Sequence, residues 1–215
     1  MRYFSVAGIV LLGLTASVFG RTNIDLGGKE PQGPKALALE YCVAAHRIGK
    51  IVLAVSNNGA FGTGQVLGGG TDCFTGQALL SCEYPKNSRT TYLFGGAFWI
   101  GAVVGRDTLV SGGADGWSRA GKELLPYEEG LAVIEKRSII DPTDPAYEGA
   151  ISEEDFIFEY ADTSSTTGSV DYFGRPHQPL FISVREASYA WSYAYAEDFV
   201  LFDYQVQNIG QRTLE

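Results

Sequence analysis

Residues 92–110 read YLFGGAFWIGAVVGRDTLV and predict a β-hairpin around which the chain is organised. Gly105-Arg106 lies between the two arms, and a glycine at the first central position supplies the positive φ of a type II′ turn. Such a turn pairs Val104 with Asp107 and fixes the register of the residues before and after them.

The first arm of this hairpin is apolar on both of its faces. Trp99 and Val103 share one face, whereas Ile100 and Ala102 share the other, because side chains alternate along a strand. A strand with two apolar faces is typical of the covered middle of a sheet. We therefore expect Trp99 and Ile100 in the core of an antiparallel β-sandwich.

The composition of the whole chain supports an all-β class. The 215 residues are 45% hydrophobic and include 27 Gly, 12 Tyr and 12 Phe, which favours short strands and tight turns. The net charge of −9 argues against nucleic acid and anionic lipid as partners, since both are bound by clustered Lys and Arg. We expect a jelly-roll or Ig-like sandwich that is incomplete at its C-terminus.

The N-terminus resembles a secretory signal. Arg2 precedes a short apolar run at residues 6–14, and the small residues Ala16, Ser17 and Gly20 follow it. This pattern predicts a signal peptide over residues 1–20 and a secreted or cell-surface location; the alternative is an N-terminal membrane anchor. Residues 21–47 are expected to form a leader with a short helical turn at 36–45, and residues 48–215 the β-sandwich domain.

Four further regions have strand patterns. They are residues 48–55, 131–140, 156–160, and a second hairpin with arms at 180–193 and 199–207. Val200, Phe202, Tyr204 and Val206 alternate onto one face of its second arm. Residues 213–215 resemble the start of another strand, so we expect this chain to be the N-terminal part of a longer protein.

Three cysteines are present: Cys42, Cys73 and Cys82. Export permits disulfides, and the short glycine-containing loop between Cys73 and Cys82 predicts a bond between these two. Cys42 would then be a buried thiol, or would pair with one of the others instead.

The acidic segment 141–162 invites a calcium interpretation, with Glu153, Glu154 and Asp155 as the candidate ligands. It lacks the D-x-D-x-D-G order of a calcium loop. A solvated acidic edge is therefore favoured, and no cofactor is expected.

Aromatic residues suggest a second kind of site. Tyr189, Trp191, Tyr193 and Tyr195 form a row on one strand, and Trp117 lies in a glycine-rich turn. Such rings could stack on sugars, although aromatic residues are also common strand formers.

No nucleophile, metal or phosphate motif is present. The sequence has neither G-x-S-x-G nor a phosphate-binding glycine loop. A Ser-His-Asp triad would need His46 or His177, and neither has a flanking signature. We therefore expect no enzymatic activity.

Residues 82–111 (CEYPKNSRTTYLFGGAFWIGAVVGRDTLVS) and 198–210 (DFVLFDYQVQNIG) resemble the N-terminal region of large secreted bacterial proteins that are similar to type IX secretion cargo. This resemblance covers most of the chain from residue 48 onward, is structural, and implies no catalytic residues. The expected function is a structural or adhesive surface module whose partners are downstream domains of the same chain, or a surface protein or glycan. The alternative is a carbohydrate-binding module.

Overall fold

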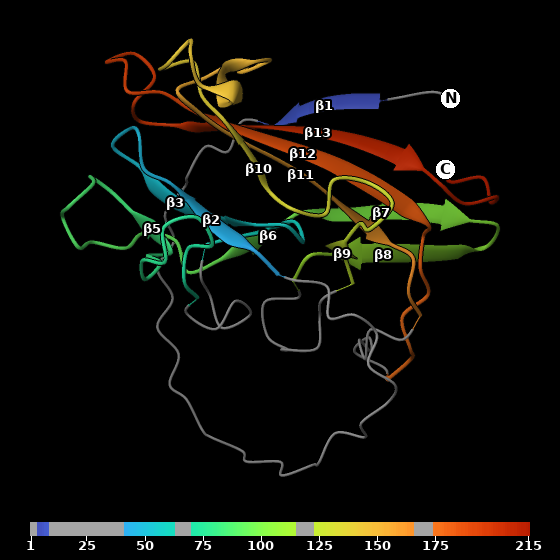
Figure 1. The fold of residues 1–215 in the computed structure, drawn as a ribbon. Coiled ribbons are helices and arrows are strands. Elements are labelled where there is room, and N and C mark those ends of the chain that lie inside the picture. Colours follow the sequence, from blue (N-terminus) through green and yellow to red (C-terminus); the bar gives the residue numbers. More distant parts are fainter. Residues whose placement is uncertain (1–3, 9–40, 63–69, 115–122, 166–173) are drawn as a thin grey trace, which may run out of the picture.

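The computed structural model describes residues 4–8, 41–62, 70–114, 123–165 and 174–215, and only the backbone of 4–8. These residues form antiparallel sheets and a single 3₁₀ turn, η1 (Pro145–Tyr147), without an α-helix in the described ranges. The all-β, antiparallel prediction is confirmed. Figure 1 shows a large sheet on one side and two smaller sheets facing it.

The large sheet has the order β1-β13-β12-β11-β10, and β9 also pairs with β11. Its strands are β1 (Phe4–Gly8), β9 (Leu125–Pro126), β10 (Glu135–Arg137), β11 (Glu154–Asp162), β12 (Ile182–Ala190) and β13 (Val200–Asn208). The predicted hairpin of the last two long strands is confirmed, with Ile182 opposite Asn208 and Ala190 opposite Val200. The backbone of β1, which lies within the predicted signal peptide, pairs with β13.

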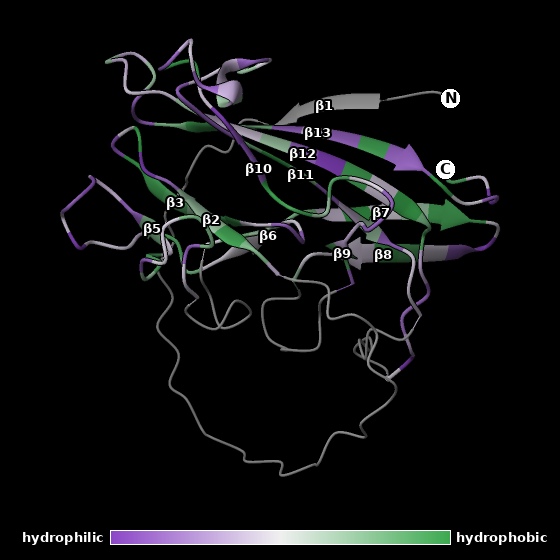
Figure 2. Cartoon of the chain, viewed as in Figure 1, coloured by the Kyte–Doolittle hydropathy of each residue, from purple (hydrophilic) through white to green (hydrophobic). Residues whose placement is uncertain are grey.

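The opposite layer contains two smaller sheets. One has the order β2-β3-β4-β6, with β5 beside β3, and the other is the hairpin β7-β8. Their strands are β2 (Val43–His46), β3 (Val52–Ser56), β4 (Ala60–Phe61), β5 (Cys82–Glu83), β6 (Gly96–Ala97), β7 (Trp99–Val104) and β8 (Asp107–Gly112). Figure 2 shows that β2 and β3 are mainly hydrophobic, whereas β10 is mainly hydrophilic.

The hydrophobic core lies between these layers. Phe156, Phe158 and Phe202 of the large sheet pack in one cluster with Leu53 and Val55 of β3. Burial of such apolar surface is the main favourable term in folding. The predicted alternation on β13 is confirmed, because Phe202 is buried in this cluster and Val200, Tyr204 and Val206 pack against it.

The hairpin at 92–110 has the predicted register but not the predicted position. Val104 lies opposite Asp107, and Gly105 has a φ of 68°. The expectation of a covered central strand is wrong, since β7 and β8 form a two-stranded sheet that is open on one face. Ile100 packs against the core, whereas Trp99 is 58% exposed.

Two other local predictions need correction. Val43 to His46 form strand β2 instead of the end of a helical turn, because their side chains are buried against the large sheet; the rest of the predicted turn, 36–40, lies outside the described residues. The strand expected at 131–140 is reduced to the three residues of β10. Within the described ranges, no helix has the length and apolar character needed to cross a bilayer.

Candidate functional site

The disulfide joins Cys42 to Cys73, not Cys73 to Cys82, so the predicted pairing is wrong. The Cα atoms of Cys42 and Cys73 are 5.6 Å apart, and Cys73 N–H donates to the carbonyl of Val43 on β2. Cys82 is a buried free thiol on β5. Cys73 and Cys82 are close in sequence but are not paired. Cys82 lies on β5 and is buried in the core, whereas Cys73 lies in a loop that folds back onto β2.

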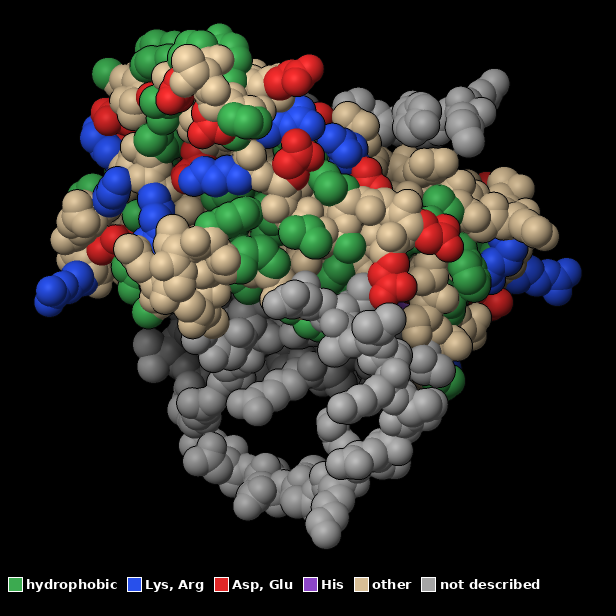
Figure 3. Space-filling view, viewed as in Figure 1, with side chains coloured by type: hydrophobic (Ala, Val, Ile, Leu, Met, Phe, Trp, Pro, Cys, Tyr) green, Lys and Arg blue, Asp and Glu red, His purple; other side chains and the backbone are tan. Residues whose placement is uncertain are grey.

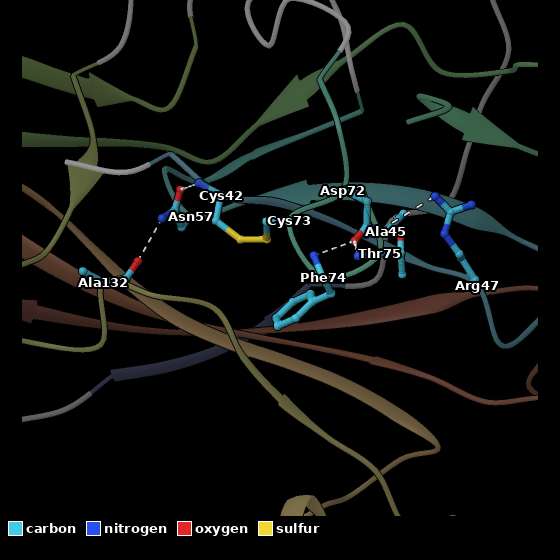
Figure 4. The surroundings of a disulfide bond; sticks show 9 residues. All are labelled: Cys42, Ala45, Arg47, Asn57, Asp72, Cys73, Phe74, Thr75 and Ala132. Carbon is cyan, nitrogen blue, oxygen red and sulfur yellow. Dashed lines mark hydrogen bonds and ion pairs between the residues drawn. A yellow bond between two sulfur atoms is a disulfide. The ribbon is translucent and has the colours of Figure 1, made fainter. Parts of the chain in front are cut away.

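Two buried polar residues hold this disulfide in place, as Figure 4 shows. Asn57 accepts from Cys42 N–H at 3.0 Å and donates to the carbonyl of Ala132 at 2.9 Å. Asp72 accepts from the N–H groups of Phe74 and Thr75 at 2.9 and 3.0 Å. Buried polar groups with such partners stabilise a local conformation. The role of this region is therefore to hold the Cys73 loop and the 131–132 segment against β2 and β3.

The three candidate calcium ligands do not converge, and the favoured solvated acidic edge is wrong for two of them, since Glu154 is 7% exposed and Asp155 0%. Glu153 accepts from the backbone and hydroxyl of Ser192, and Asp155 accepts from the N–H groups of Ile151 and Ser152. Glu154 points instead toward His46, because successive residues of a strand face opposite sides. In the described part of the chain, no three His, Cys, Asp or Glu side chains are grouped as a metal site.

His46, Ser188 and Glu154 meet between the two layers. His46 Nε2 lies 2.8 Å from Ser188 Oγ, and His46 Nδ1 lies 3.5 Å from Glu154 Oε2. This is the order of a serine-hydrolase triad. His46 and Ser188 both have 0% exposure, and the ring of Phe156 lies 4.5 Å from that of His46. A substrate cannot reach the hydroxyl in this packing, so the network serves to tie β2 to β12.

Glu154 is the charged member of that network. Its carboxylate also accepts from Arg47 N–H at 2.6 Å and from Lys136 Nζ at 3.1 Å. Burial alone would raise the pKa of Glu154, but His46, the Arg47 amide and Lys136 outweigh it and lower the pKa to about 2. Glu154 is therefore ionised in the folded protein at any ordinary pH.

A second buried network surrounds His177. Its Nε2 lies 2.8 Å from Asp162 and its Nδ1 lies 3.3 Å from Glu123. Asp162 also accepts from Ser111 Oγ at 2.5 Å and from Leu180 N–H at 2.7 Å. Burial opposes a charge on His177, but the two carboxylates outweigh it and raise the pKa of His177 to about 9. An imidazolium between two carboxylates thus joins β8 to the end of β11.

The aromatic row does not lie on one strand, because β12 ends at Ala190 and only Tyr189 belongs to it. The row divides into a buried part and an exposed part. Tyr189 is only 8% exposed and packs in a cluster with Ile157, so its ring is closed to a ligand. Trp191 is half-buried beside it. Tyr193 and Tyr195 are 42% and 83% exposed and stack with ring centroids 5.6 Å apart.

Trp117 lies outside the described residues. Phe199 is 46% exposed, and its ring centroid lies 6.1 Å from that of Trp191. The chain matches no protein family model, no curated protein and no solved structure.

Proposed function

We propose that this chain is a secreted or cell-surface β-sandwich module, of the jelly-roll or Ig-like kind, with a structural or adhesive role in a larger extracellular protein. The observation that carries the proposal is the Cys42–Cys73 disulfide in an all-β antiparallel domain. Disulfides persist in oxidising compartments and are rare in the cytosol. Downstream domains of the same chain, implied by the resemblance to secreted bacterial proteins, are its proposed partners.

The buried networks are consistent with this role. Ser188 and His46 are completely buried. His46 contacts Ser188 of β12 and Glu154 of β11, and His177 contacts Asp162 of β11 and Glu123, which precedes β9. Such contacts stabilise the domain and leave its surface to present side chains. Figure 3 shows that one face of the domain presents hydrophobic side chains in several groups between charged ones.

The redox state of the native protein tests the location. Protein isolated from its source would be alkylated before and after reduction and then analysed by mass spectrometry. We expect one alkylated cysteine, Cys82, before reduction when the protein is unfolded, and all three after it. Three free thiols in native material would contradict an oxidising location.

Attachment assays test the role. Cells that lack the gene should bind less well to surfaces coated with protein or glycan, and the complete gene should restore binding. Equal attachment of the two strains would exclude adhesion and leave only the structural role.

Carbohydrate binding is a second candidate function. It is favoured by the stacked pair of Tyr193 and Tyr195, because a sugar can stack only on an exposed ring. A glycan array with Tyr195→Ala tests this platform, and Tyr147→Ala is a matched control at an exposed tyrosine elsewhere. Specific binding that is lost only in the first variant would support it.

A further inference from the structure

The outer face of the large sheet carries a pocket of about 330 Å³. It is lined by Glu159 of β11, Ser183 and Arg185 of β12, and Gln205 and Gln207 of β13. These residues are direct partners across the strands, with Ser183 opposite Gln207 and Arg185 opposite both Gln205 and Glu159. Opposed residues share a face, so five polar side chains surround one space. Its volume is at the lower end of the range of about 300–1,000 Å³ for small-molecule sites.

Three polar side chains of this pocket have no hydrogen-bond partner among the residues that the structure describes. Ser183 is only 9% exposed, yet its hydroxyl makes no hydrogen bond within the described part of the chain. The side-chain amides of Gln205 and Gln207 also make none with the described residues. Gln205 is exposed and Gln207 is half-buried, so their amides and the hydroxyl of Ser183 are open to the pocket. They can donate hydrogen bonds to a ligand and accept hydrogen bonds from it.

The charge of the pocket is balanced. Arg185 Nη1 lies 3.2 Å from Glu159 Oε1, and the other oxygen of Glu159 accepts from Leu131 N–H at 3.3 Å. An anion attracted by Arg185 would be repelled by the neighbouring carboxylate of Glu159. A cation attracted by Glu159 would be repelled by Arg185. The remaining N–H groups of the guanidinium can still donate, because Arg has five donors. The pocket therefore suits a neutral ligand that both donates and accepts hydrogen bonds.

The other end of the same face is closed. Tyr189 and Ala187 continue the β12 row of Ser183 and Arg185, but they are buried in the cluster against which Leu131 and Leu201 pack. A ligand on this face is thus confined to the polar end. There it would be held by hydrogen bonds to side chains instead of by stacking on the aromatic row.

We propose that this pocket binds a neutral, polyhydroxylated ligand, a small saccharide. The ligand class rests on the carbohydrate-binding candidate above, but the site is separate from the Tyr193 and Tyr195 platform. Amides, a hydroxyl and a guanidinium provide both donors and acceptors around one space, and adjacent sugar hydroxyls require both.

A glycan array followed by calorimetry with the best saccharide tests the proposal on the full chain. We expect binding that is at least tenfold weaker in the double variant Gln205→Ala with Gln207→Ala, and weaker in Ser183→Ala. The control Gln77→Ala, an exposed glutamine on another loop, should bind like the wild type. Unchanged thermal melting of the variants would show that the fold is intact.

The alternative outcomes are distinct. Binding that is lost in Tyr195→Ala and retained in the double variant would overturn the pocket and leave carbohydrate binding in place at the aromatic platform. Absence of binding to any saccharide on the array would overturn both. Binding of anionic sugars alone would contradict the charge argument.

Discussion

The buried carboxylic acid of Glu186 allows a quantitative prediction of how Glu186→Gln changes the stability of the domain. Glu186 lies on β12 and is 1% exposed, with the hydroxyl of Tyr160 donating to its carboxyl at 2.8 Å. Burial disfavours the charged form and raises the pKa of Glu186 to about 8 from an ordinary 4.5. At neutral pH the folded protein therefore holds a proton on Glu186 that the unfolded chain releases.

The sign and size of the effect follow from this difference. Between pH 4.5 and 8 the folded state binds more protons than the unfolded state, so the free energy of unfolding falls as the pH rises. The free energy of unfolding falls by about 1.4 kcal/mol for each pH unit in this window. The loss is about 3 kcal/mol at pH 7 and about 5 kcal/mol above pH 8. Glutamine has nearly the same shape, can accept from Tyr160, and needs no proton.

We expect Glu186→Gln to increase the free energy of unfolding by about 3 kcal/mol at pH 7, and by more at pH 8.5, with little change at pH 4.5. Urea titrations followed by tryptophan fluorescence at these three pH values measure it. Glu128→Gln removes the same charge from an exposed position and should have almost no effect. An equal change at pH 4.5 and 8.5, or a loss of stability at pH 8.5, would refute the reasoning.

Three other predictions concern the packing. Ile100→Ala should cost about 2 kcal/mol of stability, because Ile100 packs on the core. Trp99→Ala should cost about 1 kcal/mol or less, because Trp99 is exposed. Equal costs in thermal melts would place both faces of β7 in the core. Cys73→Ser should cost about 3–4 kcal/mol in urea titrations, because the bond links residues 31 positions apart, and reducing agent should affect the wild type but not this variant. The raised pKa of His177 adds stability that is complete below pH 6.5 and is lost as the pH rises through about 9. In the Glu186→Gln background, His177→Gln should therefore flatten the dependence of the free energy of unfolding on pH in that range. An unchanged slope would exclude the imidazolium.

The sequence by itself determined the tight turn between β7 and β8 and the alternation of side chains along β13. Gly105 supplies the positive φ of the tight turn, so the register of β7 and β8 was predictable from the sequence. The alternation along β13 likewise predicted which of its side chains face the core. Both are short-range effects of backbone conformation and side-chain direction, and they need no knowledge of the rest of the chain.

The position of each strand in the fold was decided by tertiary structure. The apolar β7 became an open two-stranded sheet, whereas β11 and β12, which carry Glu159, Arg185 and Glu186, became the buried middle of the large sheet. Charges on these strands are tolerated because partners from other strands satisfy them, as Tyr160 does for Glu186. Periodicity cannot predict such partners, so it placed the wrong strand at the centre.

The polar sites also depend on contacts between distant residues. His46 meets Ser188 across 142 positions, and Cys42 meets Cys73 across 31, while the nearer Cys82 stays free. No spacing rule relates these residues, because their distances depend on how loops fold back onto strands, as for Cys42 and Cys73, and on how the two layers pack, as for His46 and Ser188. The sequence by itself determined the class, the tight turn at Gly105 and the alternation of side chains. Only the tertiary structure, through strand pairing and the packing of the layers, decided which distant groups meet.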